Sequence, residues 1–174
     1  ESALKIKKAV EANNVICYIA YCFRFNPGLQ DIFKIIQSNR LGKVYSADII
    51  SAYYLPDWRP GADYRMTYSA QRSQGGGVCL DLSHQYDYFR WLFGEAKEIL
   101  SVTKKVSDLE IDVEDVSETI IVTEKDVIGR VHLDYLSRAQ RHRLFVYASE
   151  GVLEYDFIKG QLSVTTSGEE FTQL

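Results

Sequence analysis

The chain has 174 residues, a length typical of one domain that is large enough to bury a core. Hydrophobic residues make up 46% and aromatic residues 13% of it, so the composition is that of a globular and not a disordered protein. The net charge of −4 and the lack of a basic stripe argue against nucleic acid as a partner. No apolar run reaches the ~20 residues of a membrane helix, which argues against a membrane protein. The three cysteines and three histidines lack the spacing of a zinc site, so we expect no bound metal. Cysteines that do not pair as disulfides are typical of cytoplasmic proteins, so we expect a cytoplasmic protein.

The first quarter of the chain predicts helix, strand, helix and strand in turn. Residues 3–12 mix apolar and charged side chains at helical spacing. Residues 15–23 form a continuous apolar and aromatic run, which predicts a strand buried on both faces. Asn26-Pro27 begins a second helix, because proline is well tolerated in the first turn. The apolar stripe of that helix consists of Leu29, Ile32, Phe33 and Ile36. Residues 43–54 predict a long strand.

Residues 55–74 form a polar and aromatic loop of unusual length, and long loops are often functional. Its Trp, Tyr and Arg residues supply stacking surfaces and forked donors, which suit a polyhydroxylated or anionic small molecule. The alternative is a structured surface loop whose aromatic residues cover the edge of the core. We favour binding because the loop runs directly into a helix that carries an acid and a histidine.

That helix is opened by three glycines at residues 75–77 and closed by Gly94. At 3.6 residues per turn its buried stripe is predicted to be Val78, Leu82, Tyr86, Phe89 and Phe93. The side chains predicted to point away from this stripe are Asp81, His84, Gln85 and Tyr88. Asp81, His84 and Asp87 follow one another at three-residue intervals, a spacing that lets neighbouring side chains meet on one helix surface.

Asp81 and His84 suit general acid–base chemistry, in which His84 moves a proton and Asp81 orients the ring and stabilises its charged form. Asp87 is the second candidate partner of His84. The alternative is that Asp81 lies at the positive N-terminus of the helix and His84 faces water. The glycines before the helix leave its backbone free to approach a ligand closely.

After Gly94 the pattern becomes that of consecutive short strands. They are predicted at residues 98–106, 117–123, 127–136, 143–148, 151–155 and 162–165. Short turns between consecutive strands predict an antiparallel sheet, and the preceding helices must then cover one of its faces. The other face is either solvated or covered by a partner. Tyr135, Phe145 and Tyr147 are predicted on that face, where they leave room for a subunit contact.

Five stretches occur together and in a fixed order. They are Arg24-Phe25-Asn26-Pro27, Leu41-Gly42-Lys43-Val44, the glycine-opened helix that ends in Trp91-Leu92-Phe93-Gly94, His132-Leu133-Asp134-Tyr135, and Gly151-Val152-Leu153-Glu154. This combination resembles the C-terminal part of the Gfo/Idh/MocA oxidoreductases, the family of glucose–fructose oxidoreductase and inositol dehydrogenase. The loop from Tyr54 to Ser69 is similar to that of members acting on sugars or sugar nucleotides in surface-polysaccharide pathways.

The resemblance implies an α+β fold with an open, mostly antiparallel sheet and helices on one face, similar to the C-terminal domain of glyceraldehyde-3-phosphate dehydrogenase. It implies hydride transfer between NAD or NADP and a hydroxyl-bearing carbon of a sugar, sugar nucleotide or cyclitol. His84 is then the proton-transferring residue, Asp81 assists it, and Gly76 and Gly77 contact the cofactor. The expected substrate-binding residues are Arg24, Asp57, Trp58, Arg59, Tyr64 and Asp87.

Two departures from the family pattern bear on these expectations. The chain has no GxGxxG fingerprint, so the main dinucleotide site is expected outside it. In many members the step from the aspartate to the histidine is four residues, whereas the step from Asp81 to His84 is three, so Asp87 is kept as the second candidate for the partner of His84.

We therefore expect residues 1–23 to be the remnant of the end of a nucleotide-binding domain. Residues 24–174 are then a substrate and oligomerisation domain, incomplete at its C-terminus and inactive alone. The expected assembly is a homo-oligomer formed through the open sheet face. The alternative is a non-catalytic binding or dimerisation module of the same fold.

Overall fold

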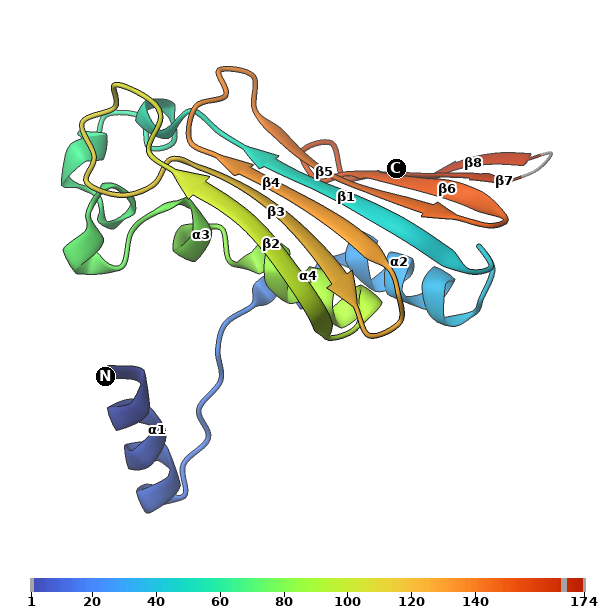
Figure 1. Cartoon of the computed structure of the whole chain (residues 1–174), viewed down its shortest axis with the longest axis horizontal. Helices are drawn as coiled ribbons and strands as arrows, with labels where there is room; N and C mark the ends of the chain where they lie inside the picture. Colours follow the sequence, from blue (N-terminus) through green and yellow to red (C-terminus); the bar gives the residue numbers. More distant parts are fainter. Residues whose placement is uncertain (1, 167–168, 174) are drawn as a thin grey trace.

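The computed structural model describes residues 2–166 and 169–173, and its main feature is one open eight-stranded sheet with helices on one face (Figure 1). The strands are β1 Val44–Ala52, β2 Ala96–Lys104, β3 Val116–Thr123, β4 Ile128–Asp134, β5 Arg141–Ala148, β6 Gly151–Asp156, β7 Gln161–Thr166 and β8 Glu169–Gln173. The α-helices are α1 Ser2–Asn13, α2 Pro27–Gln37, α3 Val78–Asp81 and α4 His84–Phe93. Five short 3-10 helices, η1 Cys22–Phe25, η2 Leu55–Asp57, η3 Tyr64–Met66, η4 Tyr68–Ala70 and η5 Arg72–Gln74, complete the described elements.

The strand order is β2-β3-β4-β1-β5-β6-β7-β8, so the first strand of the chain lies in the middle of the sheet. Each neighbouring pair is antiparallel except β1 and β4, which run parallel. The predicted fold class is therefore confirmed: an open, mostly antiparallel sheet with helices on one side. The insertion of β1 between β4 and β5 matters for function, because it brings residues around 51–58 next to residues 134–142.

The core lies between the sheet and helices α2 and α4. The Asn26 side chain caps α2 by accepting a hydrogen bond from the Leu29 amide at 3.1 Å, as the Asn-Pro start predicts. Leu29 and the Phe89 ring of α4 are fully buried. Phe89 lies so close to Gly129 of β4 that a side chain there would overlap its ring. A glycine in this strand therefore lets the helix approach the sheet closely.

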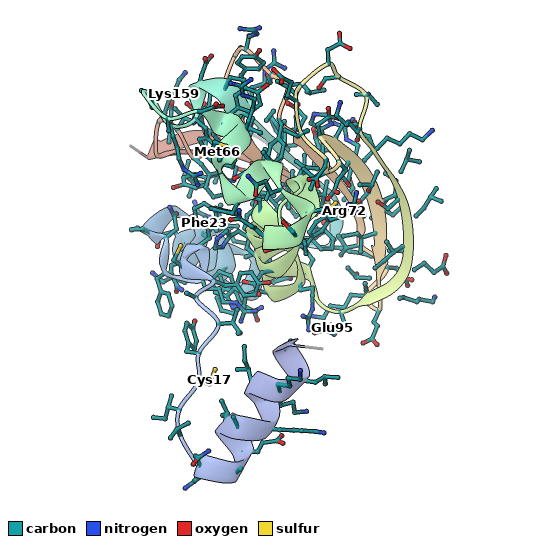
Figure 2. The ribbon with its side chains drawn as sticks, turned by 90° about the vertical axis from the view of Figure 1, so that its left-hand side faces the viewer. Cys17, Phe23, Met66, Arg72, Glu95 and Lys159 are labelled. Carbon is teal, nitrogen blue, oxygen red and sulfur yellow. The ribbon has the colours of Figure 1, made fainter. Side chains whose placement is uncertain are left out.

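The prediction of a buried strand at residues 15–23 is wrong. Helix α1 forms as predicted, but residues 15–21 are an extended segment outside the sheet, and Ile16 is 100% exposed. Figure 2 shows Cys17 on this segment, well away from the sheet domain, which the chain rejoins near Phe23. A strand buried on both faces needs neighbouring strands. The described sheet runs from β2 at one edge to β8 at the other, and none of its strands pairs with this segment.

The face of the sheet opposite the helices carries cross-strand charge pairs. Arg130 of β4 contacts Asp48 of β1 at 3.4 Å, and His132 of β4 contacts Glu118 of β3 at 2.5 Å. Tyr147 is 39% exposed there and Phe145 is half-buried. The prediction that Tyr135 lies on this face is wrong. Tyr135 follows the last residue of β4 and its ring is fully buried on the helix side.

Stability should depend on pH through His132. Its ring nitrogens contact Asp134 at 2.8 Å and Glu118 at 2.5 Å, and these partners raise the pKa of His132 above its ordinary 6.5 despite partial burial. The stabilisation is therefore complete below the unfolded pKa of about 6.5 and is lost as the pH rises through the higher folded pKa. Urea unfolding from pH 6 to 8 should show a steeper loss of stability for the wild type than for His132→Gln. Parallel curves would contradict the prediction.

Candidate functional site

A pocket of about 400 Å³ lies where α3 and α4 meet the centre of the sheet. It brings together three of the predicted site residues, Trp58, Asp81 and His84. The lining residues that the sequence analysis did not select are Phe23, Ser51, Tyr53, Tyr68, Leu82, Gln85, Gln140 and His142. They come from segments up to 119 positions apart in the chain, so only the folded arrangement of β1, α4 and β5 assembles the pocket.

The predicted single helix is interrupted between Asp81 and His84. Helix α3 ends at Asp81, Leu82 leaves helical geometry with φ −99° and ψ 30°, and α4 begins at His84. The predicted buried stripe is nevertheless confirmed, since Val78, Leu82, Phe89 and Phe93 are buried and Tyr86 is half-buried, but the stripe is wider in α4 than predicted. Gln85 and Tyr88, which were predicted to point away from the core, are buried.

The Asp81 carboxylate is held by two tyrosines. It accepts hydrogen bonds from the Tyr68 hydroxyl at 2.8 Å and the Tyr135 hydroxyl at 3.0 Å. Burial and the Asp81 charge raise the pKa of Tyr135, so this phenol remains a donor at all ordinary pH values. Among the described residues the hydrogen bonds of Asp81 thus come from tyrosines, and His84 makes none with it.

The His84 ring is held by aromatic contacts in place of hydrogen bonds. Its centroid lies 5.0 Å from that of Phe23 and 5.5 Å from that of Tyr21, both in edge-on geometry. Its Nδ1 is buried and has no partner among the described residues. Nε2 is therefore the ring nitrogen left for a ligand. Tyr21 and Phe23 were not predicted in this role, because the apolar run at residues 15–23 indicated a buried strand.

A second histidine, His142 of β5, lines the same pocket. Its Nε2 lies 3.3 Å from the amide nitrogen of Gln85, which also donates to the Ser51 hydroxyl at 2.9 Å. Burial, with a further contribution from nearby His84, lowers the pKa of His142 to about 3, so it is neutral. The signal that could have found it is the alternation of His142 with Leu144 and Val146, which places all three on the buried face of β5.

Of the site residues predicted in the 55–74 loop, Trp58 lines the pocket, whereas Asp57, Arg59 and Tyr64 do not. Asp57 lines an adjoining pocket of about 300 Å³ that also includes Arg138 and shares Tyr53, Trp58 and Gln140 with the first. The Arg59 guanidinium lies over the Tyr68 ring, 5.0 Å from its centroid, and so supports the residue that binds Asp81.

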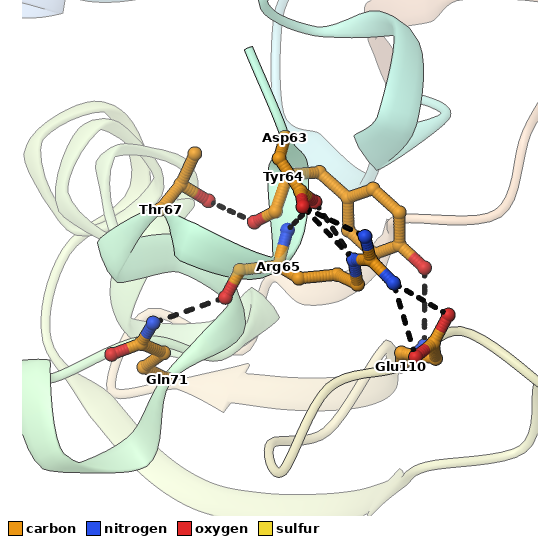
Figure 3. A network of polar contacts seen from close by, with 6 residues as sticks. All are labelled: Asp63, Tyr64, Arg65, Thr67, Gln71 and Glu110. Atoms are coloured by element: carbon orange, nitrogen blue, oxygen red, sulfur yellow. Dashed lines mark hydrogen bonds and ion pairs between the residues drawn. The ribbon is translucent and has the colours of Figure 1, made fainter.

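Tyr64 belongs to a network inside the loop. Figure 3 shows its hydroxyl beside Glu110, whose amide donates to it at 3.2 Å, while Arg65 bridges Asp63 and Glu110. Arg24 and Asp87, the remaining predicted substrate residues, bind each other at 2.8 and 2.7 Å. The structure therefore does not bring Tyr64, Arg24 or Asp87 into the lining of the pocket.

The glycine run has a structural explanation within the chain. The Gly76 amide donates to the Gln71 carbonyl at 3.0 Å, and the Gly77 amide donates to the Ser69 carbonyl at 3.1 Å. A side chain at Gly76 would overlap the Tyr68 carbonyl oxygen, and Gly77 has a φ of +107°. Cofactor binding by Gly76 and Gly77 stays a prediction, and both amide hydrogens are already used within the chain.

Replacing Gly76 by alanine should therefore weaken the fold whether or not a cofactor is present. The new Cβ would meet backbone oxygens, which cannot move away as a flexible side chain could. We expect a loss of about 1–3 kcal/mol in the free energy of unfolding, measured with urea. Gly75→Ala is the control. Gly75 has a φ of +79° but open space where a Cβ would lie, so this variant should lose only about 1 kcal/mol of the free energy of unfolding. An unchanged unfolding midpoint for Gly76→Ala would contradict this explanation.

Within residues 2–166 and 169–173, no group of three or more His, Cys, Asp or Glu side chains is placed to hold a metal ion. No helix in the same part of the chain is long and apolar enough to cross a membrane.

Comparison with known proteins identifies relatives of this arrangement. The family model described as the GFO/IDH/MocA C-terminal domain matches residues 29–154. An uncharacterized oxidoreductase of Synechocystis sp., sll0816, is 26% identical over 144 residues, which are 75% of this chain and 38% of that protein. The chain thus spans well under two thirds of this curated relative.

Solved structures share the fold at low identity. The inositol dehydrogenase homolog from Azotobacter vinelandii, complexed with NAD+, has a TM-score of 0.83 and 16% identity over 98% of this chain and 46% of that chain. Levoglucosan dehydrogenase in complex with NADH has a TM-score of 0.80 and 19% identity over 95% of this chain and 48% of its own. An oxidoreductase from Agrobacterium radiobacter, complexed with NAD+, L-tartaric acid and magnesium, has a TM-score of 0.79 and 17% identity. The match covers 98% of this chain and 49% of that chain. With a family model that matches more than half of its length, the chain belongs to the GFO/IDH/MocA oxidoreductases and carries their C-terminal domain.

Proposed function

We propose that this chain supplies the substrate pocket and the proton-transferring residue of an NAD(P)-dependent dehydrogenase. The substrate is a sugar, sugar nucleotide or cyclitol that is oxidised or reduced at a hydroxyl-bearing carbon. One observation carries the proposal: His84 lines a ring-sized pocket with Nδ1 buried and Nε2 free, in the same lining as the Asp81 carboxylate. The similar structures named above are dehydrogenases or oxidoreductases with NAD+ or NADH bound, which supports the same class.

The pocket residues have distinct parts in this chemistry. Nε2 of His84 accepts the proton of the substrate hydroxyl during oxidation and returns it during reduction. The Asp81 carboxylate, fixed by Tyr68 and Tyr135, stabilises the charged imidazolium that forms in the pocket. Trp58 and Phe23 supply apolar surface that excludes water from the reacting carbon. NAD(P), when bound, supplies the acceptor or donor of the hydride.

The residues present fit a cofactor held mainly outside this chain. A pocket of about 400 Å³ is at the small end of the usual ~300–1,000 Å³ of ligand sites and suits one substrate ring more than a dinucleotide. We further propose that residues 1–23 are the end of a nucleotide-binding domain. Support comes from Ile16 and Ile19, which are 100% and 67% exposed in a segment that pairs with no described strand.

We also propose that the sheet face opposite the helices joins copies of the chain. Apolar side chains there, Leu100, Ile120 and Tyr147, are exposed between the charge pairs, an arrangement that suits a subunit contact. Sedimentation should give a dimer or larger species for the wild type and a monomer for Ile120→Arg. A monomeric wild type would contradict this proposal.

The alternative function is a non-catalytic binding or dimerisation module of the same fold. It is favoured by one observation: among the described residues His84 donates no hydrogen bond to the Asp81 carboxylate, and a catalytic pair would use such a bond to orient the ring.

Calorimetry with NAD+ and NADH tests these two functions. The titrations use this chain and a version extended upstream through the preceding gene sequence. Binding by the extended protein alone supports the dehydrogenase and places the cofactor site mainly outside this chain. No binding by either protein removes the cofactor and leaves the non-catalytic module.

A further inference from the structure

Five hydrogen-bonding side chains line the pocket but have no part in the proposed proton transfer. We refer to them as the neutral wall. They come from β1 and the residues after it, from α4, from the connection between β4 and β5, and from β5. In chain order they are Ser51, Tyr53, Gln85, Gln140 and His142.

The neutral wall is linked by hydrogen bonds. The Gln85 amide nitrogen donates to Ser51 Oγ at 2.9 Å and to His142 Nε2 at 3.3 Å, which uses both of its hydrogens. His142 Nε2 is then an acceptor, so its ring proton lies on Nδ1. Ser51 and Gln140 lie near the Tyr53 hydroxyl and favour its charged form, against the larger opposite effect of burial on the Tyr53 pKa. The Gln85 carbonyl oxygen has no partner, although Gln85 is only 2% exposed.

The surroundings of His142 keep this wall uncharged. The His142 ring is 3% exposed and stacks on Phe157 with ring centroids 3.8 Å apart and planes 3° from parallel. Burial and the proximity of His84 oppose its protonation, and only Asp156 favours it. Burial also raises the pKa of Tyr53, so this phenol stays neutral. None of the lining residues of the pocket is an arginine or a lysine.

We propose that the neutral wall is a subsite for uncharged hydroxyl groups of the substrate, and that it rejects a carboxylate or phosphate at this position. The proposal deepens the proposed function and rests on it for the identity of the pocket. A ligand hydroxyl both donates and accepts, so it pairs with the wall's mixture of donors and acceptors. A buried acceptor without a partner, such as the Gln85 carbonyl oxygen, indicates a site that a ligand completes. An anion in this pocket would lie near the Asp81 carboxylate, and the pocket lining holds no arginine or lysine to offset its desolvation.

The charge state of His142 can be measured directly, because the chain has three histidines. The full chain is labelled with 15N-histidine, and its ring nitrogens are observed by NMR from pH 5 to 8, with His84→Gln, His132→Gln and His142→Gln for assignment. We expect His142 to stay neutral and protonated at Nδ1 throughout, while His132 titrates above its ordinary range. Titration of His142 near pH 6.5 would overturn the proposal, because the wall would then carry a positive charge.

Two matched variants test the hydrogen-bond arrangement. Gln85→Leu removes the donor to His142 Nε2 and should move part of the ring proton from Nδ1 to Nε2. Gln140→Leu removes an amide that contacts Tyr53 and not His142, so it should leave the ring proton on Nδ1. The backbone NMR spectrum of each variant must remain that of the folded chain, and Gln85→Ala replaces Gln85→Leu if the latter does not fold. An unchanged His142 ring in the folded Gln85 variant would overturn the arrangement.

Ligand selectivity is tested on the same labelled chain with pairs that differ at one group. Methyl hexopyranosides and myo-inositol are the neutral probes, and the matching methyl hexuronosides carry a carboxylate in place of a hydroxymethyl group. The neutral probes should shift the signals of His142 and the Gln85 amide, with shifts from the uronosides at least tenfold smaller at equal concentration. Equal or larger shifts with the uronosides, or none with any probe, would overturn the proposal. These NMR measurements need neither cofactor nor turnover. A result that contradicts the neutral wall therefore leaves the proposed dehydrogenase function untouched, and the reverse also holds.

Discussion

Replacing His84 by asparagine in the two-domain dehydrogenase that we propose is expected to lower kcat by about 10²–10⁴-fold, the usual contribution of a general acid–base residue. Asparagine keeps a polar side chain in the pocket but cannot take a proton from the substrate. The affinity for NAD(H) should change little, because His84 lies in the substrate pocket and not at a dinucleotide fingerprint. Steady-state kinetics give kcat, and calorimetry gives the cofactor affinity.

The matched control is His132→Asn. His132 lies on the opposite face of the sheet beside Glu118 and Asp134, so its loss should leave kcat within a factor of about two. A His84→Asn enzyme with the activity of the wild type would remove His84 from the mechanism. Equal losses in both variants would indicate damage to the fold and not to the pocket.

Replacing Arg24 by methionine should cost about 2 kcal/mol of folding stability, the largest effect that we expect from a single charge. Arg24 donates two hydrogen bonds to Asp87, and the Asp87 side chain is 7% exposed. Without Arg24, the buried Asp87 carboxylate keeps its negative charge but loses its cationic partner, which destabilises the fold. Such losses reach 3–5 kcal/mol for fully buried pairs, and the 38% exposure of Arg24 lowers our value to about 2. Urea unfolding measures it.

Two further variants separate the pair from other effects. Arg90→Met breaks the pair with Glu95, whose side chains are 55% and 59% exposed, and should cost less than about 1 kcal/mol. Combining Arg24→Met with Asp87→Leu should recover part of the loss, since no buried charge remains. Equal costs for Arg24→Met and Arg90→Met would show that burial of Asp87 does not matter. Because Arg24 follows Phe23, the single variant should also loosen the contact over His84.

Much of the fold was predictable because its signals are local. The start of α2 depends on Asn26-Pro27, which lie side by side in the chain, and the strands from β2 to β7 follow from alternating side chains and short turns. The apolar run at residues 15–23 predicted a strand that does not form, because apolar content alone does not make a strand. A strand also needs hydrogen-bonding neighbours, and the sheet has none to offer there.

The site was only partly predictable. Three of the residues proposed from the sequence, Asp81, His84 and Trp58, line one pocket, and the signal for Asp81 and His84 was a local pattern of glycines, an acid and a histidine in one short stretch. The sequence predicted that Asp81 pairs directly with His84, but the structure does not show this pairing. The helix breaks at Leu82, and the hydroxyls of Tyr68 and Tyr135 donate to the Asp81 carboxylate instead. Gly76 and Gly77 were read as open to a ligand, but their amides bind carbonyls of the preceding loop.

The sequence by itself determined the family resemblance, the order of most helices and strands, and the place of His84 in a helical stretch that follows three glycines. The tertiary structure decided what surrounds that histidine. The insertion of β1 between β4 and β5 brings Ser51 and His142 together with Gln85 of α4, although these residues lie 34 and 57 positions from Gln85. The physical reason is the range of the interactions. Helix starts and turns depend on residues a few positions apart, whereas the pocket depends on which strands pair, and that follows from burial of the whole core.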